Sequence, residues 1–274
     1  MTVAEKSSSI ERSELRNIYN SLFDFESKHK VEPYPIHKKV RIESKNLLEW
    51  IDTQLDLNDS SRILDAGCGT GNTLFHFNKK YRSTGIGLSI SAREIDFANR
   101  HGQSRGLQKA LSFLCRDFSQ SIEDLGSFDL ILAIESLKHN KDPFAIIQKF
   151  VSQLAPDGKL IILEDFLFAD ESNRDVEKHK VFWSAPGFVS IKELEKKLTA
   201  IGVNYQLTDL TPFVPVKKRW MQDLILKSIK SIKRFYNKTG IGFRNLETYE
   251  GAILLEKLYN RKEVGYFCVT VGNN

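Results

Sequence analysis

Short apolar runs alternate along the chain with longer stretches in which hydrophobic residues recur every three or four positions. The short runs predict buried strands, and the periodic stretches predict amphipathic helices. Strands are expected at 62–67, 83–88, 111–115, 128–134 and 159–164, and helices at 71–80, 91–104 and 143–154. This alternation is typical of an α/β fold, in which a mostly parallel sheet is flanked by helices.

Two further strands are expected near the C-terminus, at 203–210 and 265–271. They could close the sheet as an antiparallel pair, which would give seven strands. About fifty residues separate them, many more than a hairpin needs. Residues 212–264 are therefore expected to form a helical insertion over the carboxyl edge of the sheet, where open α/β sheets bind their ligands.

The N-terminal part adds two expected helices. Residues 11–26 predict an amphipathic helix that packs as a lid, with an apolar stripe of Leu15, Ile18, Tyr19, Leu22 and Phe23. Residues 31–36 contain two prolines and are expected to be a linker, followed by a helix over 37–55. The expected division is a tail and lid at 1–36, a core at 37–211 and 265–274, and a cap at 212–264.

A glycine-rich segment follows the first strand of the core. Asp65 precedes Gly67, Gly69 and Gly71, which gives the pattern D-x-G-x-G-x-G. The dinucleotide pattern G-x-G-x-x-G would need a glycine where this chain has Asn72. Because a carboxylate at this place would repel a diphosphate, the segment favours a nucleotide-like ligand that carries a positive charge. A tight turn without a ligand is the other interpretation.

This segment resembles the first motif of class I S-adenosylmethionine-dependent methyltransferases, which have a Rossmann-like fold, and the likeness extends over roughly residues 37–273. In that family the residue at Asp65 faces the ammonium group of the methionine moiety, and the glycine loop passes beside the cofactor. The resemblance therefore implies S-adenosyl-L-methionine as cofactor and S-adenosyl-L-homocysteine as product. It assigns this loop to the cofactor through Asp65, Gly67, Cys68, Gly69, Gly71 and Asn72.

The ends of the next strands extend the resemblance. The second strand ends in Leu88-Ser89, where many relatives have an acid for the ribose, and this ending resembles sterol, tocopherol and cyclopropane-fatty-acid methyltransferases. Asp117 and Phe118 match the position at which family members bind adenine. The chemistry agrees, because a carboxylate accepts hydrogen bonds from the adenine amino group. Ile134 ends the fourth strand and is also expected at the cofactor. A strand end at Leu88-Ser89 and a turn cap at Asp117 are the structural alternatives.

The candidate catalytic residues follow the fourth strand. Glu135 to His139 resembles the E-S/A-x-x-H segment of tocopherol and sterol methyltransferases, and either Glu135 or His139 could accept a proton. Purely structural roles for both remain open. The acceptor is expected to contact the lid, the carboxyl edge and the W-x-x-P segment that begins at Trp183. The candidate substrate residues are Tyr19, Phe23, His37, Glu164 and Trp183.

Composition narrows the class of protein. Hydrophobic residues make up 41% of the chain and charged residues 27%, as in a globular protein with a large core. Cys68, Cys115 and Cys268 are far apart and are expected to be reduced and structural, and no metal site is expected. No signal sequence or membrane span is expected, so a cytoplasmic protein is predicted. The oligomeric state is not predicted.

The net charge of +5 is concentrated in residues 217–238, where an amphipathic helix is expected from Trp220 to Tyr236. Its charged face is either a solvated pocket wall or a contact for an anionic group or a membrane surface. Nucleic acid is disfavoured because few aromatic residues accompany these cations. The predicted function is O- or C-methylation of a small, lipophilic or specialised-metabolite acceptor. N-methylation of a small amine and a non-catalytic, cofactor-binding regulatory partner are the alternatives.

Overall fold

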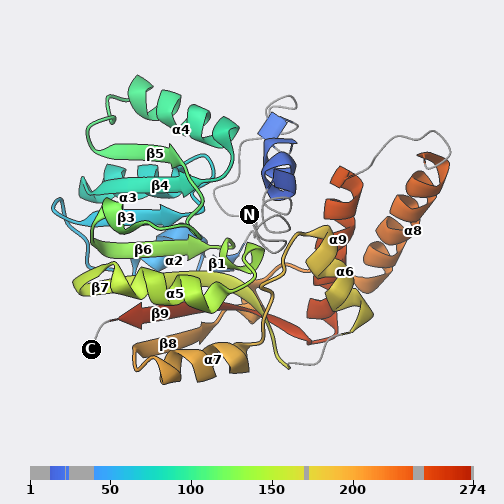
Figure 1. Ribbon diagram of the computed structural model, residues 1–274. Coiled ribbons are helices and arrows are strands. Elements are labelled where there is room, and N and C mark those ends of the chain that lie inside the picture. Colours follow the sequence, from blue (N-terminus) through green and yellow to red (C-terminus); the bar gives the residue numbers. More distant parts are fainter. Residues whose placement is uncertain (1–12, 22, 25–39, 170–172, 237–243, 273–274) are drawn as a thin grey trace, which may run out of the picture.

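The computed structural model describes residues 13–21, 23–24, 40–169, 173–236 and 244–272. Seven strands form one sheet in the order β5-β4-β3-β6-β7-β9-β8, with helices on both faces (Figure 1). The strands are β3 (Arg62–Ala66), β4 (Thr84–Ser89), β5 (Leu111–Cys115), β6 (Phe128–Ile134), β7 (Leu154–Leu167), β8 (Asn204–Asp209) and β9 (Val264–Gly272). Strands β3 to β7 are parallel, and β9 runs antiparallel to β7 and β8. The predicted α/β fold is confirmed.

The helices of the core are α3 (Asn72–Tyr81), α4 (Ala92–Ser104), α5 (Pro143–Ser152) and α7 (Ile191–Ala200). Single-turn helices η1 (Glu123–Leu125), η2 (Leu137–His139) and η3 (Thr211–Phe213) lie in the connections. Beyond one end of the sheet, α6 (Arg174–Phe182), α8 (Arg219–Tyr236) and α9 (Arg244–Asn260) pack together (Figure 1). Because α8 and α9 lie between β8 and β9, the predicted helical insertion between the last two strands is confirmed.

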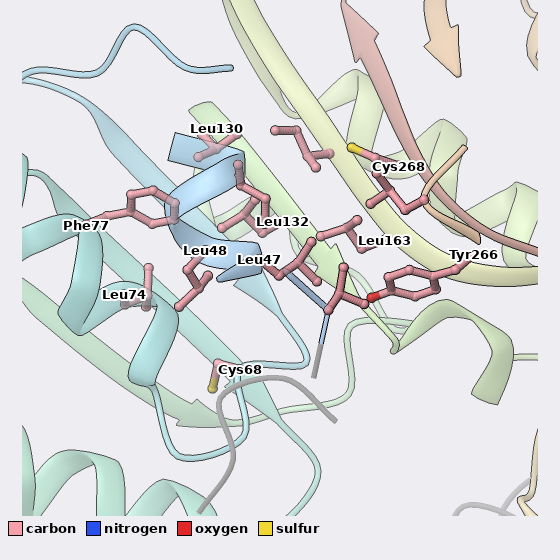
Figure 2. Packing of buried hydrophobic residues seen from close by; sticks show 14 of the residues in the cluster. Leu47, Leu48, Cys68, Leu74, Phe77, Leu130, Leu132, Leu163, Tyr266 and Cys268 are labelled. Carbon is pink, nitrogen blue, oxygen red and sulfur yellow. The ribbon is translucent and has the colours of Figure 1, made fainter. Parts of the chain in front are cut away.

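The central strands are buried on both faces. Ile63, Leu130 and Leu132 belong to one hydrophobic cluster, whereas their chain neighbours Leu64 and Ile131 belong to the cluster on the other face. Successive residues of a strand point to opposite sides, so each strand supplies both clusters. In the first cluster, Leu47 and Leu48 pack near Leu74 and Phe77 (Figure 2). Because the strands are buried on both faces, the carboxyl edge of the sheet, where the site residues lie, is firmly held.

The structure corrects the predicted helix at 37–55. Strands β1 (Arg41–Ile42) and β2 (Lys45–Asn46) form a hairpin whose turn residues Glu43 and Ser44 have φ of 50° and 68°. Only α2 (Leu47–Asp52) is helical, and Asn46 caps it by accepting a hydrogen bond from the Glu49 N–H at 3.0 Å. The apolar spacing before Asn46 therefore belongs to a hairpin, and 37–39 lie outside the described residues.

Other differences concern the ends of elements. Strand β7 extends the prediction at 159–164 in both directions, and the helix predicted at 143–154 ends at Ser152. Helix α6 was not predicted. Its signal was Asn173, whose side-chain oxygen accepts hydrogen bonds from Asp175 and Val176. Within the predicted lid, residues 13–21 and 23–24 are helical, and the linker at 31–36 lies outside the described residues.

Candidate active site

The glycine loop joins β3 to α3. Gly67, Gly69 and Gly71 have φ of 106°, 50° and 82°, which L side chains rarely adopt. A Cβ on Gly67 would lie 2.6 Å from the Cβ of Ser136, and one on Gly71 would meet the Phe113 ring, whereas one on Gly69 would meet no atom within 4 Å. The protein itself therefore requires small residues at the outer two positions, while Gly69 faces open space.

The loop is also tied to the neighbouring strand. The backbone N–H groups of Gly67 and Cys68 both donate to the Leu88 carbonyl, at 2.9 Å each. Cys68 and Leu88 are buried, and burial raises the pKa of the Cys68 thiol. The Asn72 amide donates to Thr70 Oγ1 at 3.3 Å. Cys68, Leu88 and Asn72 therefore shape and support the loop.

Asp65 is the penultimate residue of β3, directly before this loop, and is only 2% exposed. Burial raises the pKa of its carboxyl from 3.8 to about 7, and a hydrogen bond with Thr73 partly opposes the rise. A buried carboxyl of this kind gains from a nearby positive charge. The site is therefore electrostatically suited to a cationic ligand.

A cavity of about 80 Å³ lies next to the loop. Nine residues predicted for the site line it: Tyr19, Gly67, Gly69, Ser89, Asp117, Phe118, Ile134, Glu135 and His139. Leu15, Ile90, Glu94, Ser136 and Asn140 also line it and were not predicted. The volume is below that of ordinary ligand pockets, about 300 Å³ and more. Leu15 and Tyr19 belong to the N-terminal helix, which therefore covers the site.

Glu94 is the main residue that sequence reasoning missed. Its backbone N–H donates to Ser91 Oγ at 3.3 Å, as a helix cap requires, but its carboxylate accepts a hydrogen bond from Ser89 Oγ at 2.7 Å. In the sequence, the spacing of Ser91 and Glu94 is typical of a helix capping box, so it gives no separate signal that Glu94 belongs to the site. The structure thus brings a carboxylate to the end of β4, although the strand itself ends in serine.

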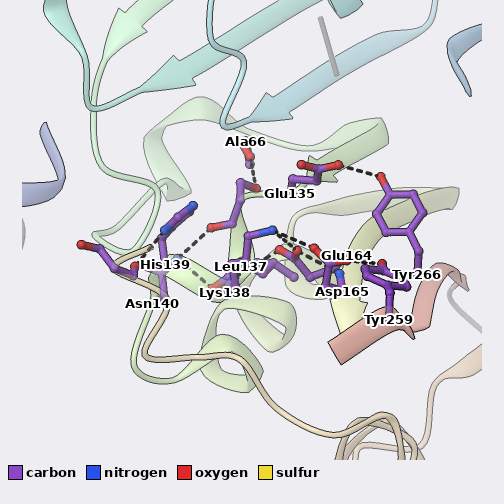
Figure 3. A network of polar contacts seen from close by, with 12 residues as sticks. Ala66, Glu135, Leu137, Lys138, His139, Asn140, Glu164, Asp165, Tyr259 and Tyr266 are labelled. Atoms are coloured by element: carbon purple, nitrogen blue, oxygen red, sulfur yellow. Dashed lines mark hydrogen bonds and ion pairs between the residues drawn. The ribbon is translucent and has the colours of Figure 1, made fainter. Parts of the chain in front are cut away.

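Glu135 lies at the end of β6 in the left-handed region, with φ of 51°. Its N–H donates to the Leu163 carbonyl at 2.7 Å, and its carboxylate accepts a hydrogen bond from the Tyr266 hydroxyl at 3.1 Å (Figure 3). These contacts, on β7 and β9, hold a backbone conformation that costs about 1–2 kcal/mol in a non-glycine residue. Glu135 is therefore fixed rigidly at the cavity wall.

A buried ionic cluster lies beside Glu135. Lys138 Nζ contacts Glu164 Oε1 at 2.7 Å and Asp165 Oδ2 at 3.2 Å, and the Tyr259 hydroxyl donates to Asp165 (Figure 3). Burial would lower the pKa of Lys138, but the surrounding carboxylates outweigh it and raise that pKa. Glu164, a predicted substrate residue, is thus an ion-pair partner and does not line the cavities described here.

His139 connects the core to its covering elements. Its Nδ1 lies 2.8 Å from the Ser184 carbonyl, and its Nε2 lies 2.9 Å from the Tyr19 hydroxyl. Because a carbonyl only accepts, Nδ1 carries a hydrogen, and in the neutral imidazole Nε2 accepts from the Tyr19 hydroxyl. Burial raises the pKa of Tyr19, so its hydroxyl stays protonated. His139 Nε2 is therefore the basic atom of this pair.

A larger cleft of about 750 Å³ also has His139 in its lining. Residues 14 and 15, α5, α6 and the segment after α6 form its walls. Its apolar lining residues are Leu15, Ala145, Ile146, Val181 and Pro186. The two cavities share Leu15, His139 and Asn140. The cleft therefore offers a second compartment next to the covered cavity.

The remaining predicted residues lie elsewhere. Phe23 packs against Phe97 of α4, with ring centroids 5.8 Å apart. Trp183 is half-buried against the first hydrophobic cluster and lines neither cavity. His37 lies outside the described residues. Among the residues that the structure describes, no cluster of three or more His, Cys, Asp or Glu could hold a metal ion, and no helix is long and apolar enough to span a membrane.

This strand order, with a buried acid and a glycine loop at the carboxyl edge, is the architecture of class I methyltransferases. The sequence matches the family model described as a methyltransferase domain over residues 57–202, which is more than half of the chain. The chain therefore belongs to this methyltransferase family, whose methyl donor is S-adenosyl-L-methionine. The family prediction is confirmed.

Individual relatives show how far the likeness extends. Norajmaline N-methyltransferase of Rauvolfia serpentina is 29% identical over 170 residues, which cover 62% of this chain and 53% of that protein. Sterol 24-C-methyltransferase of Aspergillus fumigatus is 29% identical over 131 residues, or 48% of this chain and 34% of that protein. The chain thus spans about half or less of these curated relatives.

A solved structure shows the same fold. Mycolic acid cyclopropane synthase CmaA1, determined with S-adenosylhomocysteine and CTAB, superposes with a TM-score of 0.63 at 16% identity. The superposition covers 82% of each chain. The shared architecture therefore includes most of this chain, beyond the segment that the family model matches.

Proposed function

We propose that this chain transfers the methyl group of S-adenosyl-L-methionine to an oxygen or carbon atom of a small, lipophilic acceptor. The observation that carries the proposal is the meeting of two cavities at His139. One lies beside the glycine loop, and the other is the 750 Å³ cleft, whose lining combines charged residues with Leu15, Ala145, Ile146, Val181 and Pro186. The first is assigned to the cofactor, for which it must widen, and the second to the acceptor.

Four residues are assigned to the cofactor. Asp65 balances the ammonium group, because a buried carboxyl favours a cation nearby. Gly69 allows close approach, since no protein atom occupies the space beside it. Asp117 accepts from the adenine amino group, and Glu94 serves the ribose hydroxyls in place of an acid at the end of β4. Loading requires the N-terminal helix to move, because it covers the cavity.

When bound, S-adenosyl-L-methionine supplies a methyl group activated by a positively charged sulfur. The protein orients the acceptor and excludes water, which can contribute several kcal/mol to catalysis. His139 Nε2 takes the proton of an acceptor hydroxyl, through the Tyr19 hydroxyl or directly. Glu135, held by Tyr266, positions the acceptor at the cavity wall.

N-methylation of a small amine is the second candidate. It is supported by the similarity to norajmaline N-methyltransferase and by Glu135, whose carboxylate lines the cavity and could hold an ammonium group. In N-methylation the neutral amine attacks the methyl group directly, and a general base only removes the proton that the product ammonium group loses. The acceptor assay described below distinguishes the two candidates.

Cofactor binding is tested by calorimetry with S-adenosyl-L-homocysteine on two matched variants. Gly69 and Gly106 both have positive φ, and a Cβ on either would meet no atom within 4 Å, but only Gly69 lines the cavity. Because asparagine tolerates left-handed φ, Gly69→Asn and Gly106→Asn should both fold. Gly69→Asn should lose at least tenfold in affinity and Gly106→Asn nothing. Equal affinities would contradict the site assignment.

Methyl transfer is tested by release of S-adenosyl-L-homocysteine with a prenylated quinol, a sterol and a secondary amine as acceptors. Activity on the quinol or sterol supports O- or C-methylation, and activity on the amine alone supports N-methylation. With a hydroxyl acceptor, His139→Ala should lower the single-turnover rate by about 10²-fold or more, the usual contribution of a general base. An unchanged rate would leave His139 with a structural role.

A further inference from the structure

Helix α8 has one face packed against the insertion and another face exposed. Leu226 and Ile229 are buried, and Leu226 clusters with Ile253 and Leu254 of α9. Lys233 also points toward α9, where its Nζ contacts Glu250 Oε2 at 2.8 Å. Among the described residues of the insertion, this is the face of α8 that packs against α9.

The exposed face carries large apolar side chains. The described residues include eight exposed large hydrophobic side chains, and five of them belong to α8. These five, called the apolar face here, are Trp220 (62% exposed), Met221 (37%), Leu224 (58%), Ile232 (40%) and Phe235 (67%). These five residues lie within the amphipathic helix that the sequence predicts from Trp220 to Tyr236.

Helical geometry places these side chains together. At 100° per residue, Trp220, Leu224 and Phe235 fall within about 60° of one another around the axis. Serines 228 and 231 lie between them and add no charge. Exposed Lys227, Lys230 and Arg234 border this stripe along one edge, and none of the three forms an ion pair with another described residue. Apolar and cationic surfaces therefore lie side by side.

We propose that the apolar face of α8 docks on the surface of an anionic lipid bilayer. An interfacial helix combines Trp, Phe and Leu on one side with flanking Lys or Arg that reach the headgroups. The three border cations match anionic headgroups in charge, and the apolar side chains would enter the boundary with the acyl chains.

The position of α8 supports this occupant. Helices α6, α9 and α8 lie beyond the end of the sheet at which β3 and β6 finish (Figure 1). Helix α6 also lines the 750 Å³ cleft, through Glu177, Lys180 and Val181. The docking face and the cleft thus belong to one end of the molecule. This inference goes beyond the proposed chemistry and does not depend on it.

The test is co-sedimentation of the full chain with vesicles of phosphatidylcholine alone or with 30% phosphatidylglycerol, at low and high salt. Wild type should bind the anionic vesicles at least tenfold more tightly, and salt should weaken this binding. Trp220→Ser with Leu224→Ser should abolish binding. Lys227→Gln with Lys230→Gln should weaken it about 25-fold, or about fivefold for each cation.

Matched variants act as controls. Tyr249→Ser removes an exposed aromatic ring of α9, and Lys192→Gln with Lys196→Gln removes two exposed cations of α7. Both should bind vesicles like wild type. All of these variants should bind S-adenosyl-L-homocysteine like wild type, because none of them changes the cofactor site. Loss of vesicle binding therefore tests the docking face, and loss of cofactor binding tests the proposed site. The inference would be overturned if wild type bound neutral and anionic vesicles equally, or if a stable dimer buried the apolar face of α8.

Discussion

Replacing Asp65 with asparagine should stabilise the protein while weakening its ligand site. Asp65 is almost completely buried, and its pKa rises from 3.8 to about 7 because burial disfavours the charge. In the folded state the carboxyl therefore keeps its proton between pH 4 and 7, where the unfolded chain has lost it. Asparagine has nearly the same shape and no charge to bury.

The sign follows from proton linkage. Where the folded state binds more protons than the unfolded state, the free energy of unfolding falls as pH rises. For Asp65 this loss begins near pH 4 and is complete above about pH 7, where it reaches about 4 kcal/mol. Asp65→Asn should therefore equal wild type near pH 4 and exceed it by up to about 4 kcal/mol at pH 8.

Urea denaturation followed by circular dichroism from pH 4 to 8 measures this difference, with the exposed Asp56→Asn as control. Calorimetry with S-adenosyl-L-methionine gives the second readout, because its positive charge favours ionised Asp65. Wild-type affinity should rise with pH toward about 7 and then level off, whereas Asp65→Asn should bind weakly at every pH. Parallel stability curves for wild type and Asp65→Asn would refute the reasoning.

Three further predictions concern the same edge of the sheet. In urea denaturation, Gly71→Ala should lower the free energy of unfolding by about 2–4 kcal/mol, because of its positive φ and overpacking against Phe113. Gly106→Ala has only the φ penalty and should lower it by about 1–2 kcal/mol. Equal losses would contradict this. Lys138→Met should lower the free energy of unfolding by about 3–5 kcal/mol, because it leaves buried carboxylates without their cation. Lys192→Met, at an exposed position, should change it little. Tyr19→Phe should speed release of S-adenosyl-L-homocysteine about 2- to 12-fold in stopped-flow traces, and an unchanged rate would count against the lid.

The sheet was predictable because buried parallel strands have a local signature. Ile63 and Leu64 serve opposite faces, so both must be apolar, and the run is visible without tertiary information. The hairpin at Glu43 and Ser44 was not predictable in this way, because positive φ at non-glycine residues leaves no pattern. The apolar spacing of Val40, Ile42 and Leu47 favoured a helix there.

The site residues likewise fall into those with a local sequence signal and those without one. Asp65 and the glycines could be found because their roles depend on consecutive backbone positions. The partners of His139 could not, since Tyr19 and Ser184 lie 120 and 45 residues away in sequence. Likewise, Glu94 already had a local explanation as a helix cap. Contacts made across the fold have no sequence spacing of their own.

Under the proposed function, the cofactor and the acceptor bind to different parts of the chain, and this division would account for the different acceptors of relatives. The family model covers residues 57–202, which include the glycine loop, Glu94, Asp117 and His139. The N-terminal helix and the insertion that carries α8 and α9 lie outside it. Evolution can therefore change the covering helices while the sheet keeps its rigid edge, where Glu135 is held by β7 and β9. Exchanging the covering helices between relatives should then transfer acceptor preference and leave cofactor affinity unchanged.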